Sequence, residues 1–158
     1  FMPWLMEHFE VNASAFGQFS GLYYVGYASF HILLGWLFDR FGIKWMTPLC
    51  LMLVSLGCLP LLYSSSWTYA CMGRFFVGIG SSGAALALFK LCQQGFPSHQ
   101  FARMLGFAMT IGVLGALYGG RPVHFLMEQY GVASSIQGMS GIGLGLGILI
   151  FLLFARVE

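Results

Sequence analysis

Long apolar runs separated by short polar stretches set the pattern of this chain. Each run holds about twenty residues or more, the length that a helix needs to cross the hydrocarbon core of a bilayer. The spans are expected to be helices, because lipid cannot satisfy open backbone groups and the runs are too long for barrel strands. The pattern predicts complete spans over residues 13–38, 44–63, 67–96, 101–127 and 136–154.

Polar residues between the runs predict where the helices begin and end. Residues 1–9 form the end of an earlier apolar span, and Asn12 or Ser14 is a candidate N-cap for the next helix. The third span is expected to end at Phe96, because the residue before a proline disfavours helical angles. Polar turns or loops are expected at 39–42, 98–103 and 128–135.

Composition narrows the class of protein. Hydrophobic residues make up 58% of the 158 residues and charged residues only 8%, which excludes a soluble domain. The net charge of +2 is too small to indicate a nucleic-acid partner. The span over 44–63 carries no charge after Lys44, so we expect a peripheral helix that faces mostly lipid. We predict an all-α membrane protein whose residues 1–158 form a single transmembrane helical bundle. It has about five complete helices and the end of a preceding one, and the chain is expected to be a piece of a longer protein.

Charged residues gather at the ends of the predicted spans and give the bundle an orientation. One end is basic, with Arg40, Lys44, Lys90, Arg103 and Arg156. The other end is acidic, with Glu7, Glu10 and Glu128. Cytoplasmic loops of membrane proteins carry an excess of lysine and arginine, so the turn near residue 40 is expected to lie inside the cell.

The segment from Gly35 to Lys44, at the basic end, carries the most informative motif. Asp39 stands near a helix C-terminus, where the macrodipole already carries negative charge and an acid is locally unfavourable. A cationic partner is therefore expected, from Arg40, from Lys44 or from the positive N-terminus of another helix. Gly35, one turn before Asp39 on the same face, allows another helix to approach closely.

This Gly-x-x-x-Asp-Arg-x-Gly-x-Lys segment resembles the signature between the second and third membrane helices of major facilitator superfamily transporters. The matching residues are Gly35, Leu37, Asp39, Arg40, Gly42 and Lys44. Ile43 departs from the pattern, because the family usually has a basic residue there. A rival reading is the Asp-Arg-Tyr/Phe triplet of seven-helix receptors, at residues 39–41, but it explains neither glycine and gives Lys44 no role.

Two further segments resemble parts of the same family. Arg74-x-x-x-Gly78-x-Gly80 is similar to the pattern of its fourth helix. The glycines of the 101–127 span are spaced like the antiporter signature of the fifth helix, but Gly120 stands where that signature has proline, so antiport stays open. Close helix packing is expected at Gly78, Gly80, Gly112, Gly115 and Gly119.

The resemblance implies the amino-terminal half of a transporter that lacks most of its first helix. It implies secondary active transport of a small organic solute by alternating access, with two six-helix halves rocking about a central site. The expected partners are the solute, the lipid bilayer and the carboxy-terminal half of the same protein. The expected location is the inner or plasma membrane, as a multi-pass protein. Asp39 and its basic neighbours would latch the two halves together when the protein faces outward.

Several residues within the spans are candidates for the solute or proton pathway. A charge at membrane depth costs about 2.5–3.5 kcal/mol on insertion scales, so Arg74 is expected to bind an anionic group or to influence a nearby proton carrier. The alternative is that Arg74 extends to the outer surface or pairs with an acid for structural reasons. Lys90 and Arg121 either face the solute or extend to the membrane surface. The spans carry several cations and no deep acid, so we expect an anionic or zwitterionic solute.

His31, Tyr24 and Tyr27 fall on one polar stripe of the first complete span. Histidine changes charge near physiological pH, so His31 is a candidate for proton coupling, with symport as the expected mode. The alternative is that His31 is a hydrogen-bonded packing residue. The tyrosines either bind the solute or pack with their hydroxyls satisfied by a neighbouring helix. No motif indicates an enzyme, a metal or a cofactor. The alternative function is a membrane sensor or scaffold that keeps the transporter fold without transporting.

Overall fold

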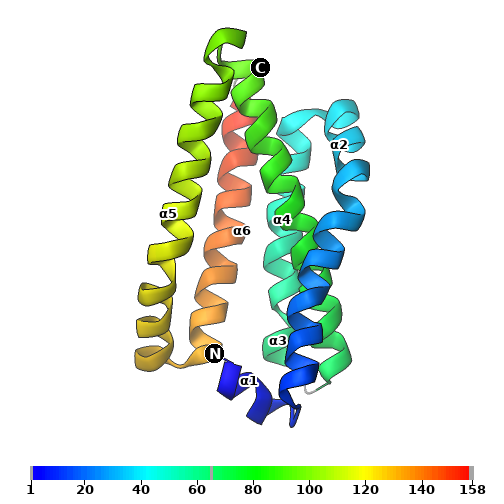
Figure 1. The fold of residues 1–158 in the computed structure, drawn as a ribbon, viewed down its shortest axis with the longest axis vertical. Helices are drawn as coiled ribbons and strands as arrows, with labels where there is room; N and C mark the ends of the chain where they lie inside the picture. The colour runs from blue at the N-terminus through cyan, green and yellow to red at the C-terminus, as the bar shows by residue number, and fades with distance from the viewer. Residues whose placement is uncertain (1, 65, 157–158) are drawn as a thin grey trace.

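The computed structural model describes residues 2–64 and 66–156, and these form an all-α bundle without strands (Figure 1). Its helices are α1 (Met2–His8), α2 (Ala13–Cys58), α3 (Pro60–Tyr63), α4 (Trp67–Gly95), α5 (Ser98–Tyr130) and α6 (Val132–Arg156). Within the described residues, four helical segments are long and apolar enough to cross a membrane. The predicted fold class is confirmed.

Helix α2 contains the first predicted span and most of the second, whose last residues form α3. Its 46 residues would form a rod of about 69 Å, far longer than the bilayer core of about 30 Å. Gly42 divides it, with φ 76° and ψ 170°, a backbone conformation that is essentially restricted to glycine. The chain reverses there, at the end of the bundle opposite α1 (Figure 1). We call residues 13–41 the first arm of α2 and residues 43–58 its second arm.

The turns are shorter than the sequence predicts. The expected turn over 39–42 is a single residue, Gly42, because the helix continues through Phe41. The polar stretches 98–103 and 128–135 are helical except at Gly131, whose φ of 81° separates α5 from α6. A polar stretch of sequence is therefore not enough to end a helix here. The end of α4 and the cap of α2 agree with prediction, since Phe96 is extended and the Asn12 side chain accepts a hydrogen bond from the Ala15 amide at 2.9 Å.

Helix α4 packs against both arms of α2 through glycines. On the first arm, Gly78 lies against the backbone carbonyl of Tyr23. On the second arm, a Cβ atom added at Gly80 would lie 2.6 Å from the carbonyl oxygen of Cys50, and one at Gly57 would lie 2.9 Å from that of Gly73. Side chains would therefore hold these helices apart.

The second arm is not the lipid-facing helix that its composition suggests. One face of it is buried against α4 and α6, and only the opposite face is exposed. The buried residues of this arm are Ile43, Met46, Pro48, Cys50, Ser55 and Gly57. The reason is that both neighbouring helices approach it at glycines, Gly80 from α4 and Gly143 from α6, which an apolar sequence does not reveal.

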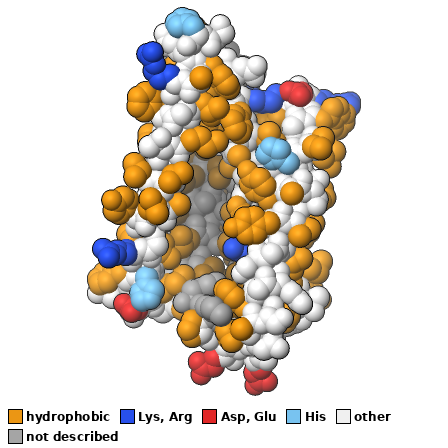
Figure 2. Space-filling view, in the orientation of Figure 1, with side chains coloured by type: hydrophobic (Ala, Val, Ile, Leu, Met, Phe, Trp, Pro, Cys, Tyr) orange, Lys and Arg blue, Asp and Glu red, His pale blue; other side chains and the backbone are white. Residues whose placement is uncertain are grey.

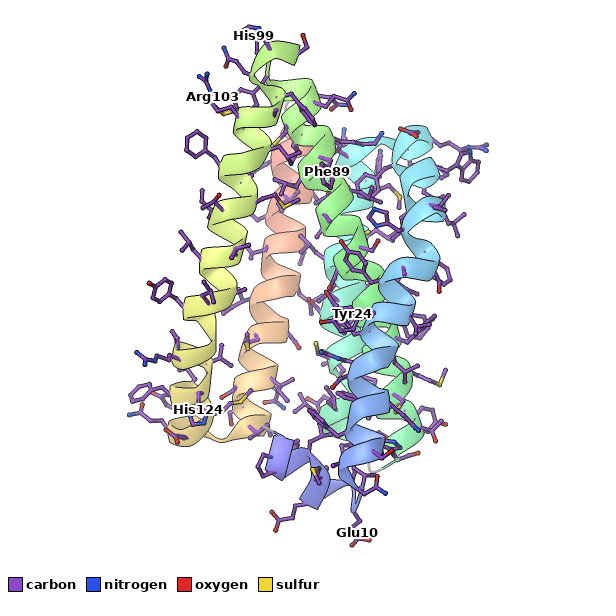
Figure 3. The ribbon with its side chains drawn as sticks, viewed as in Figure 1. Glu10, Tyr24, Phe89, His99, Arg103 and His124 are labelled. Atoms are coloured by element: carbon purple, nitrogen blue, oxygen red, sulfur yellow. The ribbon has the colours of Figure 1, made fainter. Side chains whose placement is uncertain are left out.

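Helices α5 and α6 lie side by side along the other flank of the bundle (Figure 1). Helix α6 contacts the second arm of α2. Among the described residues, α5 contacts α6 and α4 alone, and it stays largely exposed. Figure 3 shows Glu10 at one end of the bundle, His99 and Arg103 at the other, and Tyr24 about halfway between them.

Candidate functional site

A line of polar and aromatic side chains runs along the contact between the first arm of α2 and α4. Its α2 members are Tyr23, Tyr27 and His31, at spacings of four residues that keep them on one face. Tyr27 and His31 stack with ring centroids 5.5 Å apart, and Tyr23 lies 6.1 Å from Tyr27. We call this line, with Arg74 and Ser82 on α4, the polar seam.

His31 is anchored to α4 by a hydrogen bond. Its Nδ1 atom lies 2.6 Å from the hydroxyl oxygen of Ser82, which is fully buried. The tautomer decides which of the two groups donates. A proton gained or lost by this imidazole would therefore change a contact between two helices, rather than a contact with solvent alone.

Arg74 enters the seam from α4 and is held between aromatic faces. Its guanidinium carbon lies 5.1 Å from the ring centroid of Tyr23 and 5.5 Å from that of Phe19. Cation–π contacts of this kind favour a cation that is removed from water. They do not provide a counter-ion, and Arg74 forms no ion pair with any described residue.

Arg74 also lines a cavity of about 330 Å³ between the second arm of α2, α4 and α6. Its Nε atom is buried without a hydrogen-bond partner among the described residues, and so is the hydroxyl oxygen of Ser140. An unsatisfied buried donor costs about 1–3 kcal/mol, and more when it is charged. The remaining lining is mostly apolar, apart from Ser55 and Cys58. The cavity therefore presents a cation and a few polar groups that match a small anionic group.

The opposite, basic end carries the Asp39 motif. The carboxylate of Asp39 forms an ion pair with the ammonium group of Lys90, which extends from α4. Asp39 is 73% exposed and Lys90 only 21%. Arg40 forms no ion pair with Asp39 among the described residues. The partner that the helix dipole requires is thus present, and it comes from a different helix.

The other predicted site residues lie apart from this seam. Tyr24 is 70% exposed and meets the seam only through an edge contact with the Tyr23 ring. Arg121 is exposed on α5. A Cβ atom at Gly35, Gly42, Gly112 or Gly115 would meet nothing within 4 Å in the described chain, and the surroundings of Gly119 lie outside the described residues. Close packing is therefore seen at Gly78 and Gly80 alone among the predicted packing glycines.

The sequence did not point to several residues of the site, among them Tyr23, Ser82, Cys58 and Ser140. Tyr23 carried a usable signal, since it precedes Tyr27 by four residues and His31 by eight, which is one row of a helix surface. The other three are small residues in apolar runs, and nothing in their local sequence marks them. No group of three or more potential metal ligands occurs in the part of the chain that the structure describes.

Comparison with known proteins assigns the chain to a family. A model of the Major Facilitator Superfamily matches residues 1–158. The chain belongs to the major facilitator superfamily. No solved structure matches it significantly.

Two curated superfamily relatives cover most of the chain. The niacin transporter NiaP of Acinetobacter baylyi is 24% identical over 143 residues, which is 89% of this chain and 33% of that protein. The putative metabolite transport protein NicT of Pseudomonas putida is 21% identical over 138 residues, which is 87% of this chain and 31% of that protein. The chain thus spans about a third of the length of these superfamily relatives.

Proposed function

We propose that this chain is the amino-terminal part of a secondary active transporter that moves a small anionic or zwitterionic organic solute by alternating access. Membership of the superfamily and the names of two relatives, a niacin transporter and a putative metabolite transport protein, support transport. Since the chain spans a third of those relatives, the second bundle of helices would come from outside these residues. The proposed location is the inner or plasma membrane.

The surroundings of Arg74 are the main support for the proposed class of solute. A guanidinium group with an unpartnered buried Nε and no acidic partner among the described residues is set up to bind a carboxylate. The aromatic faces of Phe19 and Tyr23 would hold the guanidinium in place while the solute exchanges. The cavity volume of about 330 Å³ falls in the range of about 300–1,000 Å³ that small-molecule sites occupy.

A small monocarboxylate is the specific class that we propose. One relative is named a niacin transporter, and niacin is an aromatic carboxylic acid. Its carboxylate is the type of group that a guanidinium binds through two parallel hydrogen bonds. A monocarboxylate would also fit a site that offers one cation in mostly apolar surroundings.

Proton symport is the coupling mode that we propose, with His31 as the titrating group. His31 contacts α4 through Ser82, and α4 also carries Arg74, so protonation and solute binding would act on the same helix pair. Anion uptake with a proton would also avoid moving net charge against the membrane potential.

Asp39 and Lys90 form the proposed latch. Their ion pair joins the first arm of α2 to the far end of α4, at the basic end of the bundle. We propose that Asp39 exchanges this partner for the second bundle when the transporter faces outward, with Gly35 leaving room for the approaching helix. Arg40, Gly42 and Lys44 shape the turn around it.

Replacing Arg74 tests the solute site. In the full-length protein in liposomes, Arg74→Ala is expected to weaken the apparent affinity for a small monocarboxylate by about tenfold or more, the cost of losing a charged hydrogen bond. Arg74→Lys should lose less, and Arg103→Ala, an exposed cation at the basic end, should change little. Unchanged affinity in both Arg74 variants would remove it from the site. Solute binding without uptake in the unmodified protein would instead favour the sensor or scaffold alternative.

Replacing His31 tests the coupling. With His31→Gln, a side chain that can still hydrogen-bond Ser82 but cannot titrate, uptake is expected to lose its dependence on external pH between about 5 and 8. Initial uptake rates across that pH range provide the measurement. An unaltered pH profile in the variant would end the proton-coupling proposal for this residue.

Replacing the latch residues tests whether they affect the transport rate without affecting membrane insertion. Asp39→Asn is expected to lower the transport rate while membrane insertion and solute affinity stay close to those of the unmodified protein. Lys90→Gln should also lower the rate, because it removes the partner that holds Asp39 in the present state. Normal turnover in Asp39→Asn would contradict the latch.

A further inference from the structure

The turn of α2 carries cations stacked on exposed aromatic rings. The Arg40 guanidinium carbon lies 5.4 Å from the ring centroid of Trp36 and 5.8 Å from that of Phe41. These rings are 54% and 51% exposed, although both are large and apolar. Figure 2 shows blue and red side chains beside orange ones at this end of the molecule.

The neighbouring acid does not neutralise Arg40. Asp39 precedes it directly, but its carboxylate is held by Lys90 of α4. Arg40 forms no ion pair with any carboxylate in the described part of the chain. The ion pair across the helices therefore leaves the Arg40 guanidinium available to an external anion.

The same surface continues across the turn to α6. The Lys44 ammonium lies 5.9 Å from the ring centroid of Trp45, which is 56% exposed. The Trp45 ring also packs at 5.2 Å against Phe151 of α6. We call Trp36, Arg40, Phe41, Lys44 and Trp45 the turn surface.

We propose that the turn surface binds the phosphate of an anionic phospholipid, with Arg40 as its principal ligand. Tryptophan rings favour the headgroup level of a bilayer, so a guanidinium stacked on one lies at phosphate depth. Basic groups at that depth attract anionic lipids electrostatically. The positive-inside rule places this end of the bundle at the cytoplasmic leaflet. A soluble anion would gain nothing from the exposed rings, whereas a lipid covers them with its glycerol and acyl groups.

The latch residues would regulate this site without touching the lipid. Loss of Lys90 frees the Asp39 carboxylate, which then lies beside Arg40 and competes with the phosphate. Loss of both Asp39 and Lys90 charges removes the competitor and leaves the net charge unchanged. Lipid binding and the state of the Asp39–Lys90 pair are therefore linked.

Native mass spectrometry of the full-length protein, titrated with phosphatidylglycerol and phosphatidylcholine, tests the proposal. The unmodified protein should bind its first phosphatidylglycerol about fivefold more tightly than phosphatidylcholine, the preference expected from one favourably placed cation. Arg40→Gln should abolish the preference, and Arg40→Lys should retain most of it. Lys90→Gln should lower it at least twofold, and Asp39→Asn/Lys90→Gln should restore it.

Two controls exclude general attraction and a soluble ligand. Arg103→Gln removes another cation from the same end and should leave the preference unchanged (Figure 3). Millimolar inorganic phosphate should not displace the lipid. The proposal is overturned if the unmodified protein shows no preference, if Arg103→Gln lowers it as much as Arg40→Gln, or if inorganic phosphate competes. It is also overturned if Arg40→Gln, shown by circular dichroism to be folded, keeps the full preference.

Discussion

The contact of α4 with both arms of α2 is the constraint on which the rest of the structure depends. Glycines remove the side chains that would separate the backbones, so α4 touches the first arm at Gly78 and the second at Gly80. In a bilayer, where lipid is as apolar as the helix surfaces, such close van der Waals contact is a main source of helix association. The close approach of the helices also allows short polar side chains on them to form hydrogen bonds.

The polar seam follows from that approach. The hydroxyl of Ser82 is too short to reach His31 unless the helices nearly touch, and their atoms lie 2.6 Å apart. Arg74 is long, and the same approach brings its guanidinium group over the rings of Phe19 and Tyr23. At the far end of α4, Lys90 reaches Asp39. One packed helix pair thus carries the solute cation, the titratable group and the latch that we propose.

Sequence patterns predict the features that depend on neighbouring residues in the chain. Span lengths follow from hydrophobic runs, and the reversal at Gly42 follows from a conformation that glycine alone adopts readily. The Asp39 motif predicted a cationic partner, because the helix dipole makes an acid unfavourable there. It did not predict Lys90, which is 51 residues away and is brought near only by packing.

The sequence did not show which side of each helix faces a neighbouring helix. Tyr23 and Tyr24 are adjacent and chemically identical, but about 100° of helix rotation separates them. Only one lies in the seam, because Gly78 of α4 meets the backbone at Tyr23. The second arm was likewise misjudged as lipid-facing, since its buried and exposed faces are both apolar. Periodicity cannot distinguish a lipid-facing surface from a protein-facing one when both are hydrophobic.

The stability of Gly80→Ala in detergent micelles tests the central contact most directly. The added Cβ would lie 2.6 Å from the Cys50 carbonyl oxygen and 2.7 Å from a Val54 methyl, so the helices must shift. We predict a loss of roughly 1–2 kcal/mol in the free energy of unfolding, the cost of overpacking less the gain in helix propensity. Gly145→Ala, in open space on α6, should lose nothing. If Gly80→Ala is as stable as Gly145→Ala, α4 does not meet the second arm of α2 closely at Gly80, and the account of helix packing through glycines is wrong.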